Sequence, residues 1–316
     1  MRLALGCTFS DRVEALLDGR VGVEGFDVDI AIVEPQRLFR QTLGEQTYDI
    51  AELSMASHIA AVGQGRRDYV GLPVFLSRSF RHSNLYVRTD RGIDRPEDLA
   101  GKRIGLIDFQ QTAALWLRGI LADEHGVERT AVHWITAGLH APVLDDRMVL
   151  TLPGGIRVER SASTLDLLLR DGAIDAAISP TAPRCFADPL VPVARLWPDH
   201  RAQEVAYWRR RQVFPIMHVA VVRRMLVDQH PGLPARLFAA FEESRRLAAA
   251  DLVARDFPKV AMPWLGDSAR HAHAELGGDP WTYGLQANRE TIATMLRYAE
   301  ADGLTPSSIV ADDLFA

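Results

Sequence analysis

Lysine is nearly absent from this sequence. Of its 36 basic residues only Lys102 and Lys259 are lysines, which leaves 34 arginines. A mechanism that needs a Schiff-base lysine therefore has two candidates. Basic charge is not in excess either, because 41 acidic residues bring the net charge to -5. Proteins that hold nucleic-acid phosphates need a positive surface, so we expect no nucleic-acid partner.

Long apolar runs are also missing. No stretch approaches the roughly 18 residues of a membrane span, so we expect no membrane partner. Residues 1–7 hold an apolar core shorter than the roughly 7 to 15 residues of a secretion signal. The two cysteines, Cys7 and Cys185, do not make a disulfide framework in a chain of this size. These features predict a cytoplasmic protein.

Several catalytic motifs are absent as well. The sequence contains no Walker loop, GxSxG turn, HExxH pair or CxxC pair, so nucleotide hydrolysis, α/β-hydrolase chemistry and common zinc sites lack their markers. We expect no organic cofactor and no dedicated metal site. A divalent metal held by dispersed residues such as Glu52, His82 and His218 stays open as an alternative.

What the sequence does contain is the alternation of short apolar runs with helical periodicity that is typical of α/β folds. Its 316 residues suggest two lobes. The predicted strands are Arg2–Gly6, Asp27–Val33, Asp49–Leu53, Tyr69–Leu76, Leu85–Val87, His133–Thr136, Ala173–Ser179 and 214–224. The main predicted helices are 112–126, Thr164–Asp171, Leu233–Arg255, Ser268–Leu276 and Leu285–Ala301. Residues 137–160 are predicted to form an insertion or a hairpin.

The late strand at 214–224 precedes helices that have no sheet of their own, which favours two interleaved lobes with a cleft between them. Ligands of open α/β sheets lie beyond the carboxyl ends of the strands. The turns at these ends are therefore the candidate functional segments.

Two of these turns lie early in the chain. The turn at 6–11 is rich in small polar residues, and Ser10 or Asp11 is expected to cap a helix or to contact a ligand. In the segment 49–58, Ser54 or Ser57 is expected to cap the next helix. Glu52 is a carboxylate inside an apolar strand, so it either pairs with an arginine or has a raised pKa useful for proton transfer.

A third turn, at 77–83, crowds Arg78, Arg81 and His82 among serines. Two arginines this close could bind a dianionic ligand, because the guanidinium group matches a carboxylate with two parallel hydrogen bonds. A solvent-exposed loop is the alternative.

Two later turns complete the set. At 107–116 a strand ends and a helix begins, with Gln110 and Thr112 at the helix start. The free N–H groups of a helix start would stabilise a ligand carboxylate. The alternative is that Thr112 only caps the helix. At 214–218 His218 lies in an apolar strand, where it is either a hydrogen-bonded core residue or an acid or base.

These residues together resemble one family. The segments that carry the resemblance are AELS at 51–54, PVF at 73–75, SRSFRHS at 77–83, TAALWLRGIL at 112–121, IRVER at 156–160, FPIMH at 214–218, YGL at 283–285 and DDLF at 312–315. In these segments the chain resembles the 4,5-dihydroxyphthalate decarboxylases. The resemblance spans almost the whole chain. It implies a type II periplasmic-binding-protein-like fold, with one lobe from 1–84 plus 220–316 and the other from 85–219.

The resemblance also implies an activity: loss of CO₂ from a hydroxylated aromatic dicarboxylate, giving 3,4-dihydroxybenzoate if the substrate is 4,5-dihydroxyphthalate. Such a reaction needs an acid, a base and cations for the carboxylates. From the chemistry of the residues we expect His218 and His82 as acid and base in either order, with Glu52 as a third candidate. The expected substrate-binding residues are Arg78, Arg81, Ser54, Gln110, Thr112, Thr181 and Arg184.

Two alternatives of other kinds stay open. The chain could be a non-catalytic cytoplasmic sensor or carrier that binds an aromatic carboxylate, or an enzyme that acts on another cyclic carboxylate. The amphipathic segment Leu285–Ala301 could also bury the face of a homo-oligomer.

Overall fold

The computed structural model describes residues 1–143, 148–254, 259–306 and 308–316. The chain forms two compact α/β units. The first unit contains Met1–Arg78, Ile216–Ile292 and Val310–Ala316, and the second contains Ser79–Pro215 and Ala293–Ile309. The chain therefore crosses between the units four times, after Arg78, Pro215, Ile292 and Ile309. The predicted lobes themselves stay a proposal.

The first unit is built on a five-stranded sheet in the order β2-β1-β3-β11-β4. Its strands are β1 (Arg2–Cys7), β2 (Asp27–Ile32), β3 (Ile50–Ser54), β4 (Tyr69–Arg78) and β11 (Ile216–Arg223). Strand β1 pairs in parallel with β2 and β3, whereas β11 runs antiparallel to both β3 and β4. Residues Val219–Val222 of β11 are completely buried, as expected for β-branched and small side chains in a central strand.

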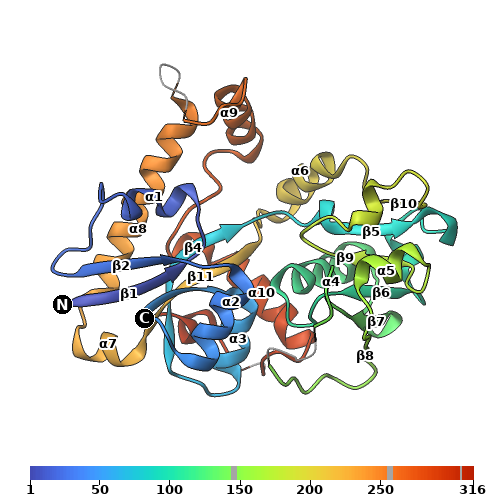
Figure 1. The fold of residues 1–316 in the computed structure, drawn as a ribbon, viewed down its shortest axis with the longest axis horizontal. Coiled ribbons are helices and arrows are strands. Elements are labelled where there is room, and N and C mark those ends of the chain that lie inside the picture. Colours follow the sequence, from blue (N-terminus) through green and yellow to red (C-terminus); the bar gives the residue numbers. More distant parts are fainter. Residues whose placement is uncertain (144–147, 255–258, 307) are drawn as a thin grey trace. The chain divides into compact units, whose positions relative to one another are not determined.

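Helices cover both faces of this sheet. The helices of the unit are α1 (Asp11–Leu17), α2 (Pro35–Arg40), α3 (Met55–Gly63), α7 (Arg224–Gln229), α8 (Leu233–Val253) and α9 (Leu265–Leu276). Helices α1 and α8 pack together on one face, and α2 and α3 lie on the other (Figure 1). A Cβ atom at Gly6 would lie 2.8 Å from Leu38 and from Tyr48, so glycine at this position lets α2 pack closely on β1.

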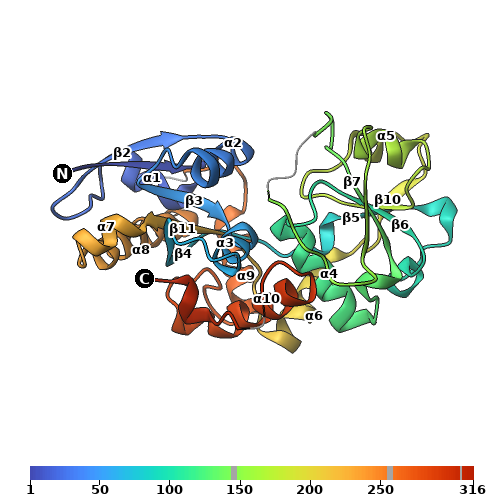
Figure 2. The same ribbon diagram turned by 90° about the horizontal axis from the view of Figure 1, so that it is seen from below.

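The second unit has a six-stranded sheet in the order β10-β5-β9-β6-β7-β8. Its strands are β5 (Leu85–Arg88), β6 (Arg103–Leu106), β7 (His133–Thr136), β8 (Arg157–Arg160), β9 (Ala176–Ile178) and β10 (Val193–Arg195). Its helices are α4 (Thr112–His125), α5 (Leu165–Arg170) and α6 (His200–Arg211). Helices α4 and α5 cover opposite faces of the sheet (Figure 2).

A buried ion cluster ties the end of the chain into this second unit. Helix α10 (Arg289–Ala301) ends just before Asp302, whose carboxylate accepts hydrogen bonds from Arg118 and Arg129. The side chains of Asp302 and Arg118 are completely buried. Removing one partner of such a buried group typically costs about 3–5 kcal/mol, so this cluster fixes the end of α10 to α4.

The structure confirms most predicted elements and corrects two. Strand β4 continues to Arg78, so this arginine ends a strand and does not lie in a loop. The segment 137–160 is not a hairpin, because β8 pairs in parallel with β7. Residues 144–147 of that segment lie outside the described residues. No helix in the described part of the chain is both long enough and apolar enough to cross a membrane.

Candidate active site

Four strand ends meet at one edge of the first unit's sheet. Strands β1, β3 and β4 run in the same direction, because β1 is parallel to β3, and β3 and β4 are both antiparallel to β11. The carboxyl ends of these three strands therefore lie at the same edge as the amino end of β11. This edge carries Glu52 and Ser54 from β3, His218 from β11 and the turn that follows Cys7.

Glu52 and His218 form a hydrogen-bonded pair at this edge. The distance from His218 Nδ1 to Glu52 Oε1 is 2.5 Å. The two residues come from neighbouring strands, since His218 pairs with Ser54 and Ala220 pairs with Glu52 in the β3–β11 ladder. The sequence predicted both residues as catalytic candidates, and the structure brings them together.

Thr8 holds the second carboxylate oxygen of Glu52. Both its backbone N–H and its hydroxyl donate to Glu52 Oε2, each over 2.7 Å. Burial raises the pKa of Glu52, but the hydrogen bonds and charge of His218 and the two donors of Thr8 outweigh burial, so the pKa is lowered. Glu52 is therefore a carboxylate at neutral pH, so the expected raised pKa does not apply. The expected arginine partner is also corrected, since the groups that hold this carboxylate are His218 and Thr8.

The two members of the pair differ in their access to a ligand. The side chain of Glu52 is 1% exposed, whereas that of His218 is 21% exposed. Because an ionised carboxylate only accepts, His218 Nδ1 carries the hydrogen of this bond. No hydrogen-bond partner is described for His218 Nε2, so this atom is the one available to a substrate. The ring edge of Phe39 packs against the imidazole, with a centroid separation of 5.0 Å.

Glu52 faces the same side of the sheet as α1 and α8, whereas the imidazole of His218, at the end of its strand, also contacts Phe39 of α2. Gly6 of β1 faces α2 because Leu38 lies over it, and neighbouring strand residues alternate, so Cys7 faces away from α2. The β1–β3 register continues from Gly6–Ala51 to place Cys7 beside Glu52. Burial and then the charge of Glu52 raise the pKa of Cys7 to about 12, which agrees with this placement.

Arg12, near the start of α1, contacts strand β4. Its Nε donates to Leu76 O over 3.0 Å and its Nη1 to Asp11 Oδ1 over 2.6 Å. Leu76 belongs to β4 and precedes Ser77, the residue that pairs with His218. Arg12 therefore contacts the strand that pairs with β11, one residue from the partner of His218.

The predicted serine caps have different outcomes. Ser10 occupies the cap position of α1 but its side chain makes no capping hydrogen bond. Ser54 caps α3, because its hydroxyl accepts from the N–H of Ser57 over 3.3 Å. A substrate contact by Ser54 stays a prediction.

Arg78 is placed inside the first unit. It is 5% exposed, and its Nη1 donates to the carbonyls of Pro280 and Thr282 over 3.2 Å each. Burial lowers its pKa to about 10. These contacts give Arg78 a role in holding the segment 280–284 against β4, and its predicted role in substrate binding stays a prediction.

His82 and Arg81 belong to the second unit. His82 is 4% exposed and packs against the rings of Trp197 and Tyr207, with centroid separations of 5.2 and 5.5 Å. Burial, followed by the charge of His125, lowers its pKa to about 4, so the ring is neutral near pH 7. Arg81 donates to Asn84 Oδ1 over 3.0 Å.

A carboxylate with a raised pKa lies beside Arg81. Burial raises the pKa of Glu204 on α6 to about 7, against the opposing effects of the Ser83 N–H and the charge of Arg81. The sequence analysis did not identify Glu204, because a glutamate in a polar helix gives no sequence signal that its side chain is buried.

The remaining predicted contacts also lie in the second unit. Gln110 is completely buried, and within the described residues neither of its amide atoms has a hydrogen-bond partner. Gln111, not Thr112, occupies the cap position of α4, which corrects the predicted cap. Thr181 and Arg184 are exposed. The structure therefore places Gln110, Thr181 and Arg184 in one unit and the Glu52–His218 pair in the other.

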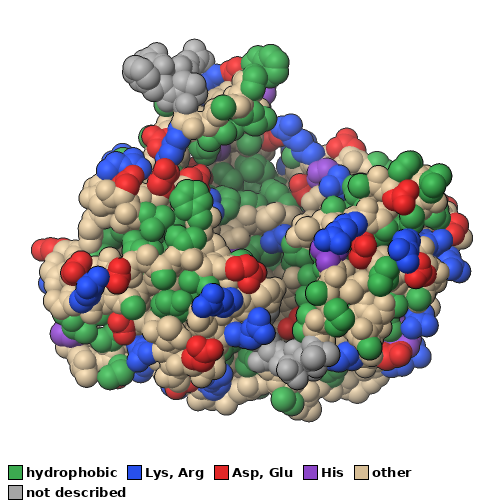
Figure 3. Space-filling view, in the orientation of Figure 1, with side chains coloured by type: hydrophobic (Ala, Val, Ile, Leu, Met, Phe, Trp, Pro, Cys, Tyr) green, Lys and Arg blue, Asp and Glu red, His purple; other side chains and the backbone are tan. Residues whose placement is uncertain are grey.

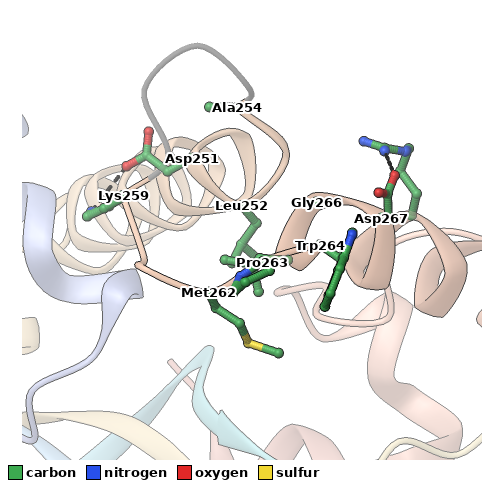
Figure 4. Close-up of a pocket in the computed structure, with 11 residues that line it drawn as sticks. Asp251, Leu252, Ala254, Lys259, Met262, Pro263, Trp264, Gly266 and Asp267 are labelled. Carbon is green, nitrogen blue, oxygen red and sulfur yellow. Dashed lines mark hydrogen bonds and ion pairs between the residues drawn. The ribbon is translucent and has the colours of Figure 1, made fainter.

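A pocket of about 460 Å³ lies elsewhere in the first unit, at the junction of α8 and α9 (Figure 4). Its charged side chains are paired: Lys259 with Glu14 and Asp251, and Arg270 with Asp267. Figure 3 shows hydrophobic side chains on this part of the surface, where Trp264 and Met262 are among the exposed residues. None of the described residues that line this pocket is a histidine or a cysteine.

The described residues contain no group of three or more His, Cys, Asp or Glu side chains arranged to hold a metal ion. Glu52 uses both carboxylate oxygens for His218 and Thr8. A metal at Glu52 would have to displace these donors.

Comparisons with known proteins agree with this fold. A family profile described as NMT1/THI5 like matches residues 23–155. A 4,5-dihydroxyphthalate decarboxylase of Comamonas testosteroni is 37% identical, covering 100% of this chain and 96% of that protein. A protein of the same name from Pseudomonas putida is 36% identical over 63% of this chain and 78% of its own length. Among solved structures, the periplasmic sulfonate-binding protein SsuA of Methylobacillus flagellatus KT matches with a TM-score of 0.60 and 15% identity, covering 100% of this chain and 91% of that chain. The likeness to SsuA shows a periplasmic-binding-protein-like fold.

Proposed function

Because the chain belongs to the 4,5-dihydroxyphthalate decarboxylase family, we propose that it converts 4,5-dihydroxyphthalate to 3,4-dihydroxybenzoate and CO₂, with His218 as the proton donor to the ring. The observation that supports this role best is the Glu52–His218 hydrogen bond, which leaves Nε2 of a partly exposed imidazole for the substrate. A buried carboxylate that orients an imidazole is a common acid–base arrangement.

The reaction requires one proton at the ring carbon that bears the leaving carboxylate. The ionised hydroxyl para to that carbon donates an electron pair into the ring, and a new C–H bond forms with the proton of His218 Nε2. The C–C bond to the carboxylate then breaks, its electrons restore aromaticity, and CO₂ leaves. His218 regains a proton from water, so one proton is consumed for each CO₂ released.

Glu52 and Thr8 prepare the imidazole for this step. The ionised Glu52 accepts the hydrogen bond from His218 Nδ1 and so fixes the orientation of the imidazole. Thr8 in turn holds Glu52 with two donors. Because Glu52 is 1% exposed, its charge is weakly screened and acts mainly on His218.

The residues of the second unit keep their predicted roles within this proposal. His82 was expected as acid or base, and Arg81, Gln110, Thr112, Thr181 and Arg184 as substrate contacts. The neutral, buried ring of His82 fits a packing role as well. A cytoplasmic location and a homo-oligomer also remain part of the proposal, to be tested by cell fractionation and by the mass of the protein in solution.

The decisive experiment follows CO₂ release and product mass from 4,5-dihydroxyphthalate in D₂O. The proposal expects turnover and one deuterium in the product, at the carbon that lost its carboxylate. His218→Ala is expected to lower kcat roughly 100- to 10,000-fold, the usual contribution of a positioned acid or base. His271→Ala is the matched control, since His271 is an exposed histidine of the same unit.

Other results would contradict the proposal. Tight binding of the substrate without turnover would favour a sensor or carrier. Full activity of His218→Ala would remove the proton donor from the scheme while leaving the decarboxylase activity in place.

A further inference from the structure

We propose that Arg12 and Tyr283 form the subsite for the carboxylate that the substrate retains, with Trp281 holding the guanidinium group in place. This inference rests on the proposed function, because it specifies which side chains hold the spectator carboxylate beside His218. All three residues belong to the first unit.

The Arg12 guanidinium is fixed from two directions. It stacks on Trp281, at 4.1 Å from the ring centroid, and its Nε donates to Leu76 O. Trp281 is itself anchored, since its Nε1 donates to Phe75 O over 2.9 Å and its backbone N–H donates to Asp279 Oδ1 over 2.8 Å. A guanidinium held in this way loses little side-chain entropy when it binds an anion.

One edge of this guanidinium is open to a ligand. Nε and Nη1 are used by Leu76 and Asp11, and no partner of Nη2 is found in the described part of the chain. The side chain is 19% exposed, so it is neither fully solvated nor sealed. Asp11 offsets part of the charge, but it is 38% exposed and its effect is screened by water.

Tyr283 provides a second donor that the fold leaves unused. It is 7% exposed, and its buried hydroxyl has no hydrogen-bond partner among the described residues. After burial, the charge of Arg12 acts most strongly on this hydroxyl, followed by those of Arg245, Glu242 and Asp11. Geometry agrees with this proximity, since Tyr283 lies two residues from Trp281, on which Arg12 stacks. Burial raises the pKa of Tyr283, which keeps the hydroxyl protonated and able to donate. A buried donor without a partner costs about 1–3 kcal/mol, and a ligand carboxylate would remove that cost.

The position of this pair suits the spectator group. Leu76 precedes Ser77, the residue of β4 that pairs with His218. Arg12 therefore contacts the strand residue next to the partner of the proposed proton donor. A cation that grips the leaving carboxylate would oppose the loss of CO₂. Arg12 and Tyr283 are therefore assigned to the retained carboxylate.

The test compares two ligands that differ only in that carboxylate. Binding of 3,4-dihydroxybenzoate and of catechol is measured by titration calorimetry for the unmodified protein and for Arg12→Gln, Arg12→Lys and Tyr283→Phe. Arg2→Gln is the matched control, because Arg2 is an exposed arginine of the same unit. The ratio of the two dissociation constants isolates the contribution of the carboxylate.

We expect the unmodified protein to bind 3,4-dihydroxybenzoate about 10- to 100-fold more tightly than catechol. This is the gain in affinity that charge-assisted hydrogen bonds to one carboxylate typically give. Arg12→Gln should reduce this preference to about twofold without weakening catechol. Arg12→Lys and Tyr283→Phe should reduce it partly, and Arg2→Gln should leave it unchanged.

An unchanged preference in Arg12→Gln would overturn the inference, as would equal weakening of both ligands or the absence of binding by the unmodified protein. The outcome is separable from that of the proposed function. CO₂ release together with an unchanged preference for 3,4-dihydroxybenzoate in Arg12→Gln would support the decarboxylase activity and contradict the Arg12 subsite. Loss of that preference in Arg12→Gln, in a protein that releases no CO₂, would support the Arg12 subsite and contradict the proposed reaction.

Discussion

Replacing Thr8 by valine tests whether the buried carboxylate of Glu52 supports proton transfer. Valine has nearly the shape of threonine, so the substitution removes the hydroxyl bond to Glu52 Oε2 and keeps the bond from the backbone N–H. A hydrogen bond to a charged group contributes about 1.5–3 kcal/mol. Because Glu52 is 1% exposed, water replaces little of this loss.

The loss should appear in catalysis as well as in stability. A carboxylate held by one donor fewer has a higher pKa and is less firmly oriented, so it stabilises the His218 imidazolium less well. We expect kcat at pH 7 to fall about tenfold, which corresponds to about 1.4 kcal/mol. The free energy of unfolding should fall by about 1–2 kcal/mol.

The pH dependence distinguishes a positioning role from a merely structural one. The proposed mechanism needs Glu52 ionised, so activity is lost as the pH falls through the pKa of Glu52. Thr8→Val raises that pKa, and the acid limb of the kcat profile should therefore move to higher pH. Thr8→Ser keeps the hydroxyl and should retain the unmodified profile. An acid limb that does not move in Thr8→Val, or that moves equally in Thr8→Ser, would refute the reasoning.

Three further predictions follow from the same contacts. Burial lowers the folded pKa of His82 to about 4, from an ordinary value of 6.5. The unfolded chain therefore binds an extra proton between these pH values, and stability falls by up to about 3 kcal/mol as the pH drops through this window. His82→Phe should make the loss between pH 7 and pH 4.5 smaller by about 2–3 kcal/mol in denaturant titrations, while His58, whose pKa burial also lowers to about 4, keeps its own contribution. An unchanged pH dependence would contradict this account. Glu52→Gln should lower kcat more than 10-fold with little change in KM, whereas a change confined to KM would assign Glu52 to substrate binding. Chelator treatment followed by added Mg²⁺ or Zn²⁺ should leave kcat of the unmodified enzyme unchanged, since Glu52 already has three donors, and metal-dependent turnover would count against the scheme.

The sequence predicted the elements of the fold well because their signals are local. Strand β7 has the predicted bounds and α4 ends within one residue of them. The end of β4 was misjudged because Ser77 and Arg78 look like loop residues. Only the pairing of Arg78 with Ile216 of β11 shows that the strand continues. Long-range pairing of this kind leaves no local signal.

The candidate site was predicted in its residue types but not in its connections. Glu52 and His218 stand out because each is a polar residue inside an apolar strand. Their contact depends on the antiparallel register of β3 and β11, across 166 residues of sequence. Thr8 lies in a turn that the sequence marks as a candidate, although nothing local indicates that it binds Glu52.

Arg12 illustrates the limit most clearly, since it is one of 34 arginines and lies at a helix start where a charged residue is unremarkable. What distinguishes it is its set of contacts, with Leu76 O on β4 and with the ring of Trp281. These partners lie 64 or more residues away in the sequence, so no local pattern indicates them. Because Leu76 precedes Ser77, the partner of His218, these contacts bring Arg12 to the part of β4 that pairs with the start of β11. Arg78 contributes to this arrangement from the end of β4. It donates to the carbonyls of Pro280 and Thr282, the residues on either side of Trp281, and the ring of Trp281 carries the guanidinium group of Arg12.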